Sequence, residues 1–419
     1  MKFCDIWKYG KSVTTYFAAS AIPMLLMVLA NPLIALNMSP EDYAVSGYYN
    51  SFSALMSPVI VFYMVHYYSK RYYEVDSEAR LRLKAMLFKA LIFFSFGMSV
   101  ICLGLLAAYL FVVKKDFSFP FMPYAAIMVF AIPLTGVYKL EQTECRMSRD
   151  SKGYFNITVA SGVILVLMNL LFVAGVKWGA LGKMLAPMVT NLIVFLYVVV
   201  RYRKLFRIKT TFEEFRRTLT FCLPLASGAM LGYFSNGFDR TYMESLGNVT
   251  EYGYYIVGAQ IAGYLTVAAA SVTSTFQPDI YEAIAMRNRN SLVRTCVMQI
   301  GLIAAGVAVF VILCPLIINL LTAGRYVEST PYARIISLST LTSSIYYVIN
   351  NYTIAKGKPR LYLYTTVIGS ILTVAAYPAV VGNYGYYGGA YMTGISFAVL
   401  AAVNLVLLGI SRVLGNRRA

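Results

Sequence analysis

Residues 221–265 read FCLPLASGAMLGYFSNGFDRTYMESLGNVTEYGYYIVGAQIAGYL. This stretch predicts two apolar helices joined by a short polar turn. The first helix has Pro224 near its start and Asp239-Arg240 at its end, and the second opens at Glu251. A proline inside an apolar helix is tolerated in a membrane, where neighbouring helices and water satisfy the freed carbonyl group, but it is costly in an ordinary soluble helix. The stretch therefore favours a membrane protein.

The composition of the whole chain points the same way. Of 419 residues, 59% are hydrophobic and 13% are charged, whereas an ordinary soluble protein has about 25% charged residues. Apolar runs of about 20 residues are long enough to cross a bilayer as helices. We therefore expect an all-α integral membrane protein with twelve transmembrane helices, near 14–36, 44–67, 85–113, 119–138, 154–176, 179–200, 218–238, 252–276, 296–321, 331–354, 361–381 and 386–411.

The net charge of +18 arises from cations that are unevenly distributed. Most of the 36 Lys and Arg residues fall at the termini and in alternate loops, and the most basic stretch is 201–217. The opposite loops carry five cations: Lys114, Lys115, Lys177, Arg240 and Arg325. Because cytoplasmic loops are enriched in Lys and Arg, we expect both termini to be cytoplasmic. The charge then reports topology, and we expect no nucleic-acid partner.

The two halves of the chain share landmarks in the same order. Four pairs of landmarks are separated by 201 to 209 residues: Pro23 and Pro224, Glu41-Asp42 and Thr250-Glu251, Lys152 and Lys358, and Gly179 and Gly385. Weak internal symmetry of this kind is common in transporters. We expect an N-terminal six-helix lobe (1–200), a basic cytoplasmic linker (201–217) and a C-terminal six-helix lobe (218–419). The lobes would be pseudo-symmetric and surround a central cavity.

Several of these motifs resemble those of a known family. They are Phe221-Cys222-Leu223-Pro224-Leu225, Asp239-Arg240, the Glu251–Tyr255 helix start, and the Tyr-Gly-x-x-Gly element at 384–388. Together they resemble the polysaccharide transporter family, the O-antigen and capsule repeat-unit flippases of the multidrug, oligosaccharidyl-lipid and polysaccharide exporter superfamily. The N-terminal half departs from this pattern, because Asn37-Met38 stands where an Asp-Arg pair would be expected.

The resemblance implies a function. Such a flippase moves an undecaprenyl-pyrophosphate-linked oligosaccharide, by alternating access, from the cytoplasmic to the periplasmic leaflet of a bacterial inner membrane. The sugar and pyrophosphate need a polar cavity to cross roughly 30 Å of hydrocarbon. Expected partners are this lipid-linked oligosaccharide, membrane lipids, and polymerase and chain-length proteins of the same pathway. Coupling to the membrane potential or to an ion gradient stays open.

Ionisable and polar residues inside the expected spans are the candidate site residues. Lys183 and Arg334 are candidates for anion contacts. The alternative, equally supported for each, is that the side chain extends to the membrane interface and places its charge in water. Gln260, Asn350 and Asn351 are candidates for sugar hydrogen bonds, with hydrogen bonding between helices as the alternative.

Three further residues are candidates for gating or proton transfer. Asp239 and Arg240 are expected to form a structural pair that holds a gate closed. His66, the single histidine, is a candidate proton site, although an interfacial polar role suits it better.

Other classes of function find less support in the sequence. No nucleophile with a partnered base, metal-ligand cluster or Gly-rich phosphate loop occurs, so we expect no catalytic residue, no metal and no cofactor. A cation-coupled multidrug or metabolite antiporter of the same superfamily is the first alternative, and the scarcity of acids deep in spans disfavours it. A polysaccharide polymerase or glycosyltransferase is the second, and it lacks the expected long outer loop.

Overall fold

The structure is a computed structural model that describes residues 3–355 and 359–416. Within these ranges the regular secondary structure is helical and includes no strand, which confirms the all-α expectation. Lys358, one of the repeated landmarks, lies outside the described residues.

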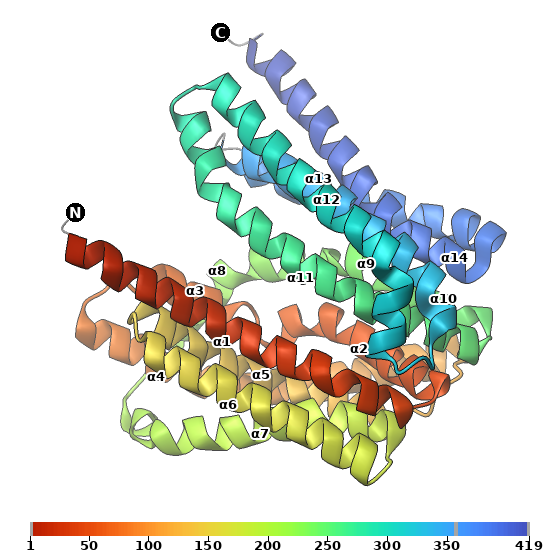
Figure 1. The fold of residues 1–419 in the computed structure, drawn as a ribbon. Coiled ribbons are helices and arrows are strands. Elements are labelled where there is room, and N and C mark those ends of the chain that lie inside the picture. The colour runs from red at the N-terminus through yellow and green to blue at the C-terminus, as the bar shows by residue number, and fades with distance from the viewer. Residues whose placement is uncertain (1–2, 356–358, 417–419) are drawn as a thin grey trace. The chain divides into compact units, whose positions relative to one another are not determined.

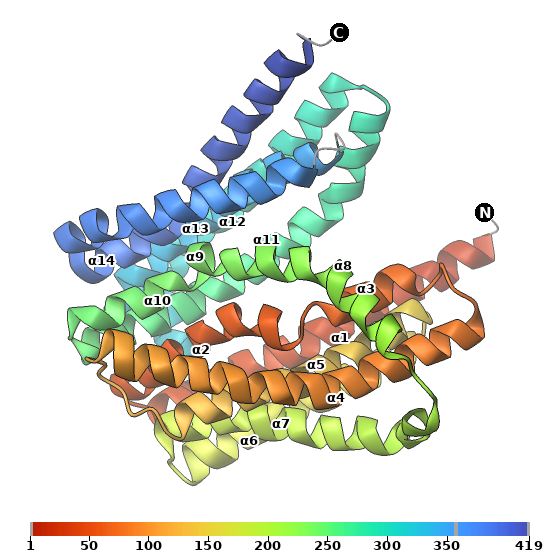
Figure 2. The ribbon, with the colours of Figure 1, turned by 180° about the vertical axis from the view of Figure 1, so that it is seen from behind.

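The contacts divide the chain into two compact units (Figures 1 and 2). Unit 1 comprises Met1–Met230 with Leu321–Ala323. In it, α1 packs along α6, and α5 packs along both α4 and α7. Its helices are α1 (Phe3–Leu36), α2 (Pro40–Ile60), α3 (Met64–Arg71), α4 (Ser77–Ala108), η1 (Tyr109–Lys114), α5 (Tyr124–Met147), α6 (Ser151–Asn169), η2 (Leu170–Gly175), α7 (Gly179–Arg201), η3 (Arg203–Arg207) and most of α8 (Phe212–Leu231).

Unit 2 comprises Leu231–Leu320 and Gly324–Ala419. In it, α13 packs against both α11 and α14. Its helices are α9 (Tyr233–Asn236), α10 (Phe238–Met243), η4 (Glu244–Leu246), α11 (Val249–Ala285), α12 (Arg289–Leu321), η5 (Val327–Ser329), α13 (Thr330–Ala355) and α14 (Pro359–Asn416). The long α14 is interrupted at Gly385, whose φ of 56° and ψ of −134° are not helical.

Eight helices in the described part of the chain are long and apolar enough to cross a membrane. One of them, the segment Leu361–Ser411, contains the interruption at Gly385 and covers both of the last two spans expected from sequence. The expected second span, 44–67, is divided between α2 and α3. The chain is therefore a multi-pass membrane protein, while the count of twelve spans and the sidedness of the termini stay predictions.

Two of the repeated landmarks have matching geometry in the two units. Gly179 has a φ of 51° and Gly385 a φ of 56°, in the left-handed region that favours glycine. In unit 1 the backbone N–H of Ala180, next to Gly179, donates to Asp42 Oδ1 at 2.8 Å. In unit 2 the hydroxyl of Tyr386, next to Gly385, accepts a 3.0 Å hydrogen bond from the N–H of Asn248.

The same landmarks also begin a helix in each unit. Ser39 caps α2 by accepting from the N–H of Asp42 at 3.2 Å, and Asn248 caps α11 by accepting from the N–H of Glu251 at 3.1 Å. Each cap lies three residues before the acid of its landmark. In each unit the glycine landmark therefore lies close to the start of the helix that carries the acidic landmark, although different groups make the contact.

The basic segment 201–217 belongs to unit 1, together with nearly all of α8. Leu205 of η3 is buried in the same apolar cluster as Phe88 and Leu91 of α4 and Val198 of α7. The division into residues 1–200, 201–217 and 218–419 as lobe, linker and lobe stays a prediction.

Candidate functional site

Helix α5 carries a polar face, part of which lies in residues after 138 that were expected from sequence to form a loop. Thr135, Lys139, Gln142 and Arg146 follow one another at spacings of four, three and four residues, so they share one side of the helix. Lys139 and Arg146 are exposed. The span expected from sequence ended at 138, which left both cations in a loop, but α5 continues to Met147.

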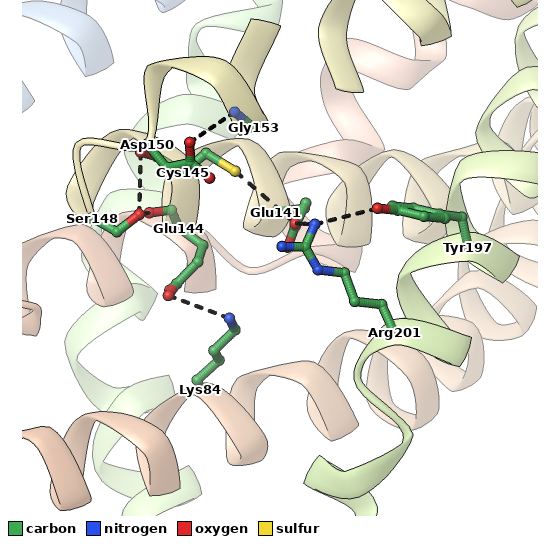
Figure 3. A network of polar contacts seen from close by, with 9 residues as sticks. All are labelled: Lys84, Glu141, Glu144, Cys145, Ser148, Asp150, Gly153, Tyr197 and Arg201. Carbon is green, nitrogen blue, oxygen red and sulfur yellow. Dashed lines mark hydrogen bonds and ion pairs between the residues drawn. The ribbon is translucent and has the colours of Figure 1, made fainter. Parts of the chain in front are cut away.

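The acids of α5 lie on its other side and are neutralised within unit 1 (Figure 3). Glu141 is 1% exposed, and its Oε1 accepts from Arg201 Nη1 of α7 at 2.9 Å. Glu144 Oε1 lies 3.4 Å from Lys84 Nζ of α4. Burial and a hydrogen bond to Glu141 raise the pKa of Tyr202, which follows α7. Helix α5 thus has its paired acids on the side packed against α4 and α7, and its cations on the opposite, exposed side.

The cations of α5 line a cavity of ≈ 770 Å³, which we call the basic cavity. Lys139 and Arg146 face it together with His66 of α3, and none of the described residues that line it is acidic. Arg146 Nη2 also donates to Thr143 Oγ1 at 3.0 Å. The lining residues come from α2, α3, α5, α8 and the α2–α3 connection: Ala54, Ser57, Pro58, Val61, Tyr63, Val65, His66, Ser69, Lys139, Gln142, Thr143, Arg146, Met147 and Ala229.

A second space of ≈ 250 Å³, the polar hollow, lies beside the basic cavity. The two share Ser57 and Lys139. Asn191 of α7 donates to Thr135 Oγ1 at 2.9 Å in its wall. The remaining polar lining residues are Asn50 and Ser53 of α2. A cationic space therefore lies next to one whose polar lining consists mainly of amide and hydroxyl groups.

The wall of the basic cavity includes a break between two helices. Helix α2 ends at Ile60 and α3 begins at Met64, and the intervening Phe62 and Tyr63 have φ values of 51° and 54°. Non-glycine residues in this region store local strain of about 1–3 kcal/mol each. The ring of Tyr63 stacks on that of His66 with centroids 4.6 Å apart. Discontinuous membrane helices are typical of binding sites in transporters.

Among the residues expected from sequence, the structure brings His66 into the basic cavity. It does not bring Lys183 there. The ammonium group of Lys183, in the first turns of α7, lies 4.6 Å from the ring centre of Tyr43 in α2. Lys183 lines neither the basic cavity nor the polar hollow. Its role as an anion contact stays a prediction.

The candidate residues of α11 and α13 lie in unit 2. Arg334 is exposed, and its Nε donates to the carbonyl oxygen of Val311 in α12 at 3.1 Å. Asn350 is 8% exposed, and its Oδ1 has no hydrogen-bond partner among the described atoms. Asn351 is half-buried. Gln260 is half-buried beside the hydroxyl of Tyr264. Sugar contacts by these amides also stay predictions.

The Asp239-Arg240 pair lies in the short helix α10. Asp239 is 5% exposed and accepts a short hydrogen bond from the Tyr255 hydroxyl of α11. The carbonyl oxygen of Arg240 accepts a 3.0 Å hydrogen bond from Tyr252, one turn earlier in α11. These contacts join α10 to α11, which suits a structural pair. The role in a gate stays a prediction.

Sequence reasoning missed Lys139 and Arg146 because apolar runs alone set the ends of the spans. The signal that identifies them is the polar spacing of Thr135, Lys139, Gln142 and Arg146, which is helical. Within the described chain, no group of three or more His, Cys, Asp and Glu residues is arranged to hold a metal ion.

Comparison with known proteins gives similarities along most of the chain. Residues 79–331 match the family model described as polysaccharide biosynthesis protein. The chain is also similar to protein 1 of the Lsg locus of Haemophilus influenzae, with 21% identity over 378 residues, which cover 88% of this chain and 90% of that protein.

Two solved structures resemble the fold closely. An inward-facing multidrug resistance MATE family transporter of the MOP superfamily superposes with a TM-score of 0.71 at 14% identity, covering 96% of this chain and 99% of the other. The lipid II flippase MurJ, in an inward closed conformation, superposes with a TM-score of 0.73 at 13% identity, covering 94% and 87%. The chain therefore has the fold that these transporters share.

Proposed function

The chain belongs to the polysaccharide biosynthesis protein family, and from this premise we propose that it is a flippase for lipid-linked oligosaccharides. Its family and its structural neighbours are transporters of the MOP superfamily rather than enzymes. The proposed substrate is an undecaprenyl-pyrophosphate-linked repeat unit of O-antigen or capsule. The proposed direction is from the cytoplasmic to the periplasmic leaflet of a bacterial inner membrane.

The basic cavity is the observation that carries this proposal. Lys139 and Arg146 face the same space, and the acids of their own helix are paired elsewhere. Hydrogen bonds between a cation and a phosphate are worth about 1.5–3 kcal/mol each even after exchange with water. Two such side chains can therefore compensate part of the cost of removing a pyrophosphate from bulk water.

The polar hollow supports a place for the sugars. It is lined by the amides of Asn50 and Asn191 and by the hydroxyls of Ser53 and Thr135. Amides and hydroxyls can both donate and accept hydrogen bonds, as sugar hydroxyls do. Because Lys139 lines both spaces, a phosphate held by this residue would leave its attached sugar next to the hollow. The polyprenyl chain can remain in the bilayer.

The charge of the basic cavity also weighs against the antiporter alternative. A cationic drug entering it would meet Lys139 and Arg146 without a facing acid among the described lining residues. Like charges at close range repel each other. An anionic substrate fits this space better. Twelve spans, cytoplasmic termini and alternating access are part of the same proposal.

Deletion of the gene tests this function. We expect the deletion strain to lose surface polysaccharide and to accumulate the lipid-linked repeat unit on the cytoplasmic leaflet. Wild-type protein should restore export, whereas a Lys139→Gln/Arg146→Gln variant present at the same membrane level should not. Loss of polysaccharide without accumulation of a lipid-linked intermediate would refute the proposal.

A further inference from the structure

We propose that the segment 203–209 is a binding surface for anionic phospholipid headgroups, independent of the transport cavity. We call this segment the basic strap. It follows the candidate span Gly179–Arg201 directly, so it lies where a membrane helix meets the headgroup region. The proposal goes beyond the proposed function and does not depend on it.

The basic strap is fixed to unit 1 by apolar contacts and one hydrogen bond. Leu205 is 6% exposed and lies in the apolar cluster that contains Phe88. The rings of Phe88 and Phe206 have centroids 5.4 Å apart. Lys89 Nζ of α4 donates to the carbonyl oxygen of Ile208 at 2.6 Å. The strap is therefore a docked element with a defined inner side.

The inner side determines where the charges lie. Leu205 is buried and Ile208 is half-buried, so the apolar side chains of both face unit 1. The four polar side chains of the strap are all exposed. All four are cations, Arg203, Lys204, Arg207 and Lys209, and in the described part of the chain none of them forms an ion pair with a carboxylate. The strap thus presents four uncompensated positive charges within seven residues.

Three other cations of unit 1 differ from those of the strap, because each forms an ion pair with a nearby acid. Arg71 pairs with Glu74 at 2.8 Å, Arg82 with Glu78 at 2.6 Å and Arg217 with Glu213 at 2.5 Å. These neighbouring acids would repel an anionic headgroup as well. The strap therefore complements a negatively charged surface better than these acid-paired positions do.

Two aromatic side chains, one within the strap and one shortly after it, favour a lipid as the partner. Phe206 is 37% exposed and Phe212 is 77% exposed. Cations interleaved with exposed aromatic residues are typical of segments that lie in the membrane interface, and clusters of Lys and Arg next to a membrane helix attract anionic lipids. A nucleic acid or an acidic protein would provide the charge but no apolar layer for Phe212.

Purified full-length protein in a neutral detergent allows a direct test. Native mass spectrometry would measure the apparent Kd for phosphatidylglycerol, with phosphatidylcholine as the uncharged probe. In the Arg203→Gln/Lys204→Gln/Arg207→Gln variant we expect the Kd for phosphatidylglycerol to rise about tenfold, because each cation near an anionic surface adds to the attraction. Binding of phosphatidylcholine should not change.

The matched control is the Arg71→Gln/Arg82→Gln/Arg217→Gln variant, which removes the same charge from acid-paired positions of unit 1. It should change the Kd for phosphatidylglycerol by less than about twofold. An equal loss in both variants, or a loss confined to Lys139→Gln/Arg146→Gln, would overturn the proposal. Single substitutions of Lys204 and Arg207, each expected to weaken binding severalfold, keep the test decisive if the triple variant folds poorly.

Discussion

Arg334 donates a hydrogen bond to the carbonyl oxygen of Val311, a helical carbonyl that lacks its usual partner. The partner would be the N–H of the residue four positions later, but that residue is Pro315, inside α12. Arg334 Nε supplies the missing donor at 3.1 Å. The arginine that the sequence indicated as an anion contact thus has an observed role in joining α13 to α12.

A double-mutant cycle separates these two roles of Arg334. We expect Arg334→Ala to destabilise the protein by about 1–2 kcal/mol, because a polar carbonyl in an apolar environment loses its donor. In a Pro315→Ala background the new N–H can bond to Val311, and the same substitution should cost less than about 0.5 kcal/mol. Unfolding in mixed micelles measures both. A direct substrate contact would instead appear as lost export in both backgrounds.

Gly179 and Gly385 provide a second comparison, because their φ values are nearly equal and their surroundings differ. A Cβ at Gly179 would lie 2.3 Å from Asp42 Oδ1, whereas a Cβ at Gly385 meets nothing within 4 Å. Because its ψ of −134° places Gly385 in a region that other residues rarely adopt, we expect Gly385→Ala to cost about 1–3 kcal/mol through backbone strain alone. Gly179→Ala should cost roughly twice as much, since Asp42 must also move. Equal losses of thermal stability would contradict this account.

The ion pair between Glu141 and Arg201 offers a third prediction. Arg201→Gln leaves a carboxylate that is 1% exposed without its cation. We expect a loss of about 2–3 kcal/mol, less than for a fully buried pair because the Arg201 side chain is 44% exposed. Adding Glu141→Gln should recover at least half of the loss, as measured by denaturant unfolding. No recovery would show that the pair is not coupled.

Lys139 provides a fourth prediction, which concerns charge rather than shape. Lys139→Arg should retain at least about half of the export activity, because it keeps the cation that both spaces share. Lys139→Gln should lower export at least about tenfold, because losing one charged hydrogen bond costs about 1.5–3 kcal/mol and about 1.4 kcal/mol corresponds to a factor of ten. Lys152→Gln, on α6 and outside both spaces, is the control and should export normally. A similar loss in all three variants would argue against a specific role for this charge.

The fold class could be predicted from sequence because apolar length is a direct physical signal. The repeated landmarks were also informative, since Asp42 and Gly179 contact each other around a sharp backbone turn that needs glycine. The ends of the spans were less predictable. Helix α5 continues past its apolar part, where Glu141 and Glu144 form ion pairs with Arg201 of α7 and Lys84 of α4. These partners are distant in sequence, so the pairs could not be predicted.

The candidate site was harder to predict for the same reason. Whether Lys139 is a loop residue or a cavity residue depends on which side of α5 the acids occupy, and that is set by Arg201, 62 positions later in the chain. The break at Phe62 and Tyr63 is similarly hidden, because neither residue is a glycine or a proline. His66 was a candidate because it is the single histidine of the chain. Its position beside Lys139 and Arg146 depends on the fold and could not be predicted from sequence.

The most direct test of the central claim is a flipping assay in proteoliposomes. A fluorescent polyprenyl-pyrophosphate-linked oligosaccharide would be placed in one leaflet, and its appearance in the other would be measured by chemical quenching. We predict rapid translocation by the wild-type protein and at least a tenfold slower rate for Lys139→Gln/Arg146→Gln at equal reconstitution. Equal rates for the two proteins would contradict the assignment of the basic cavity as the path of the pyrophosphate.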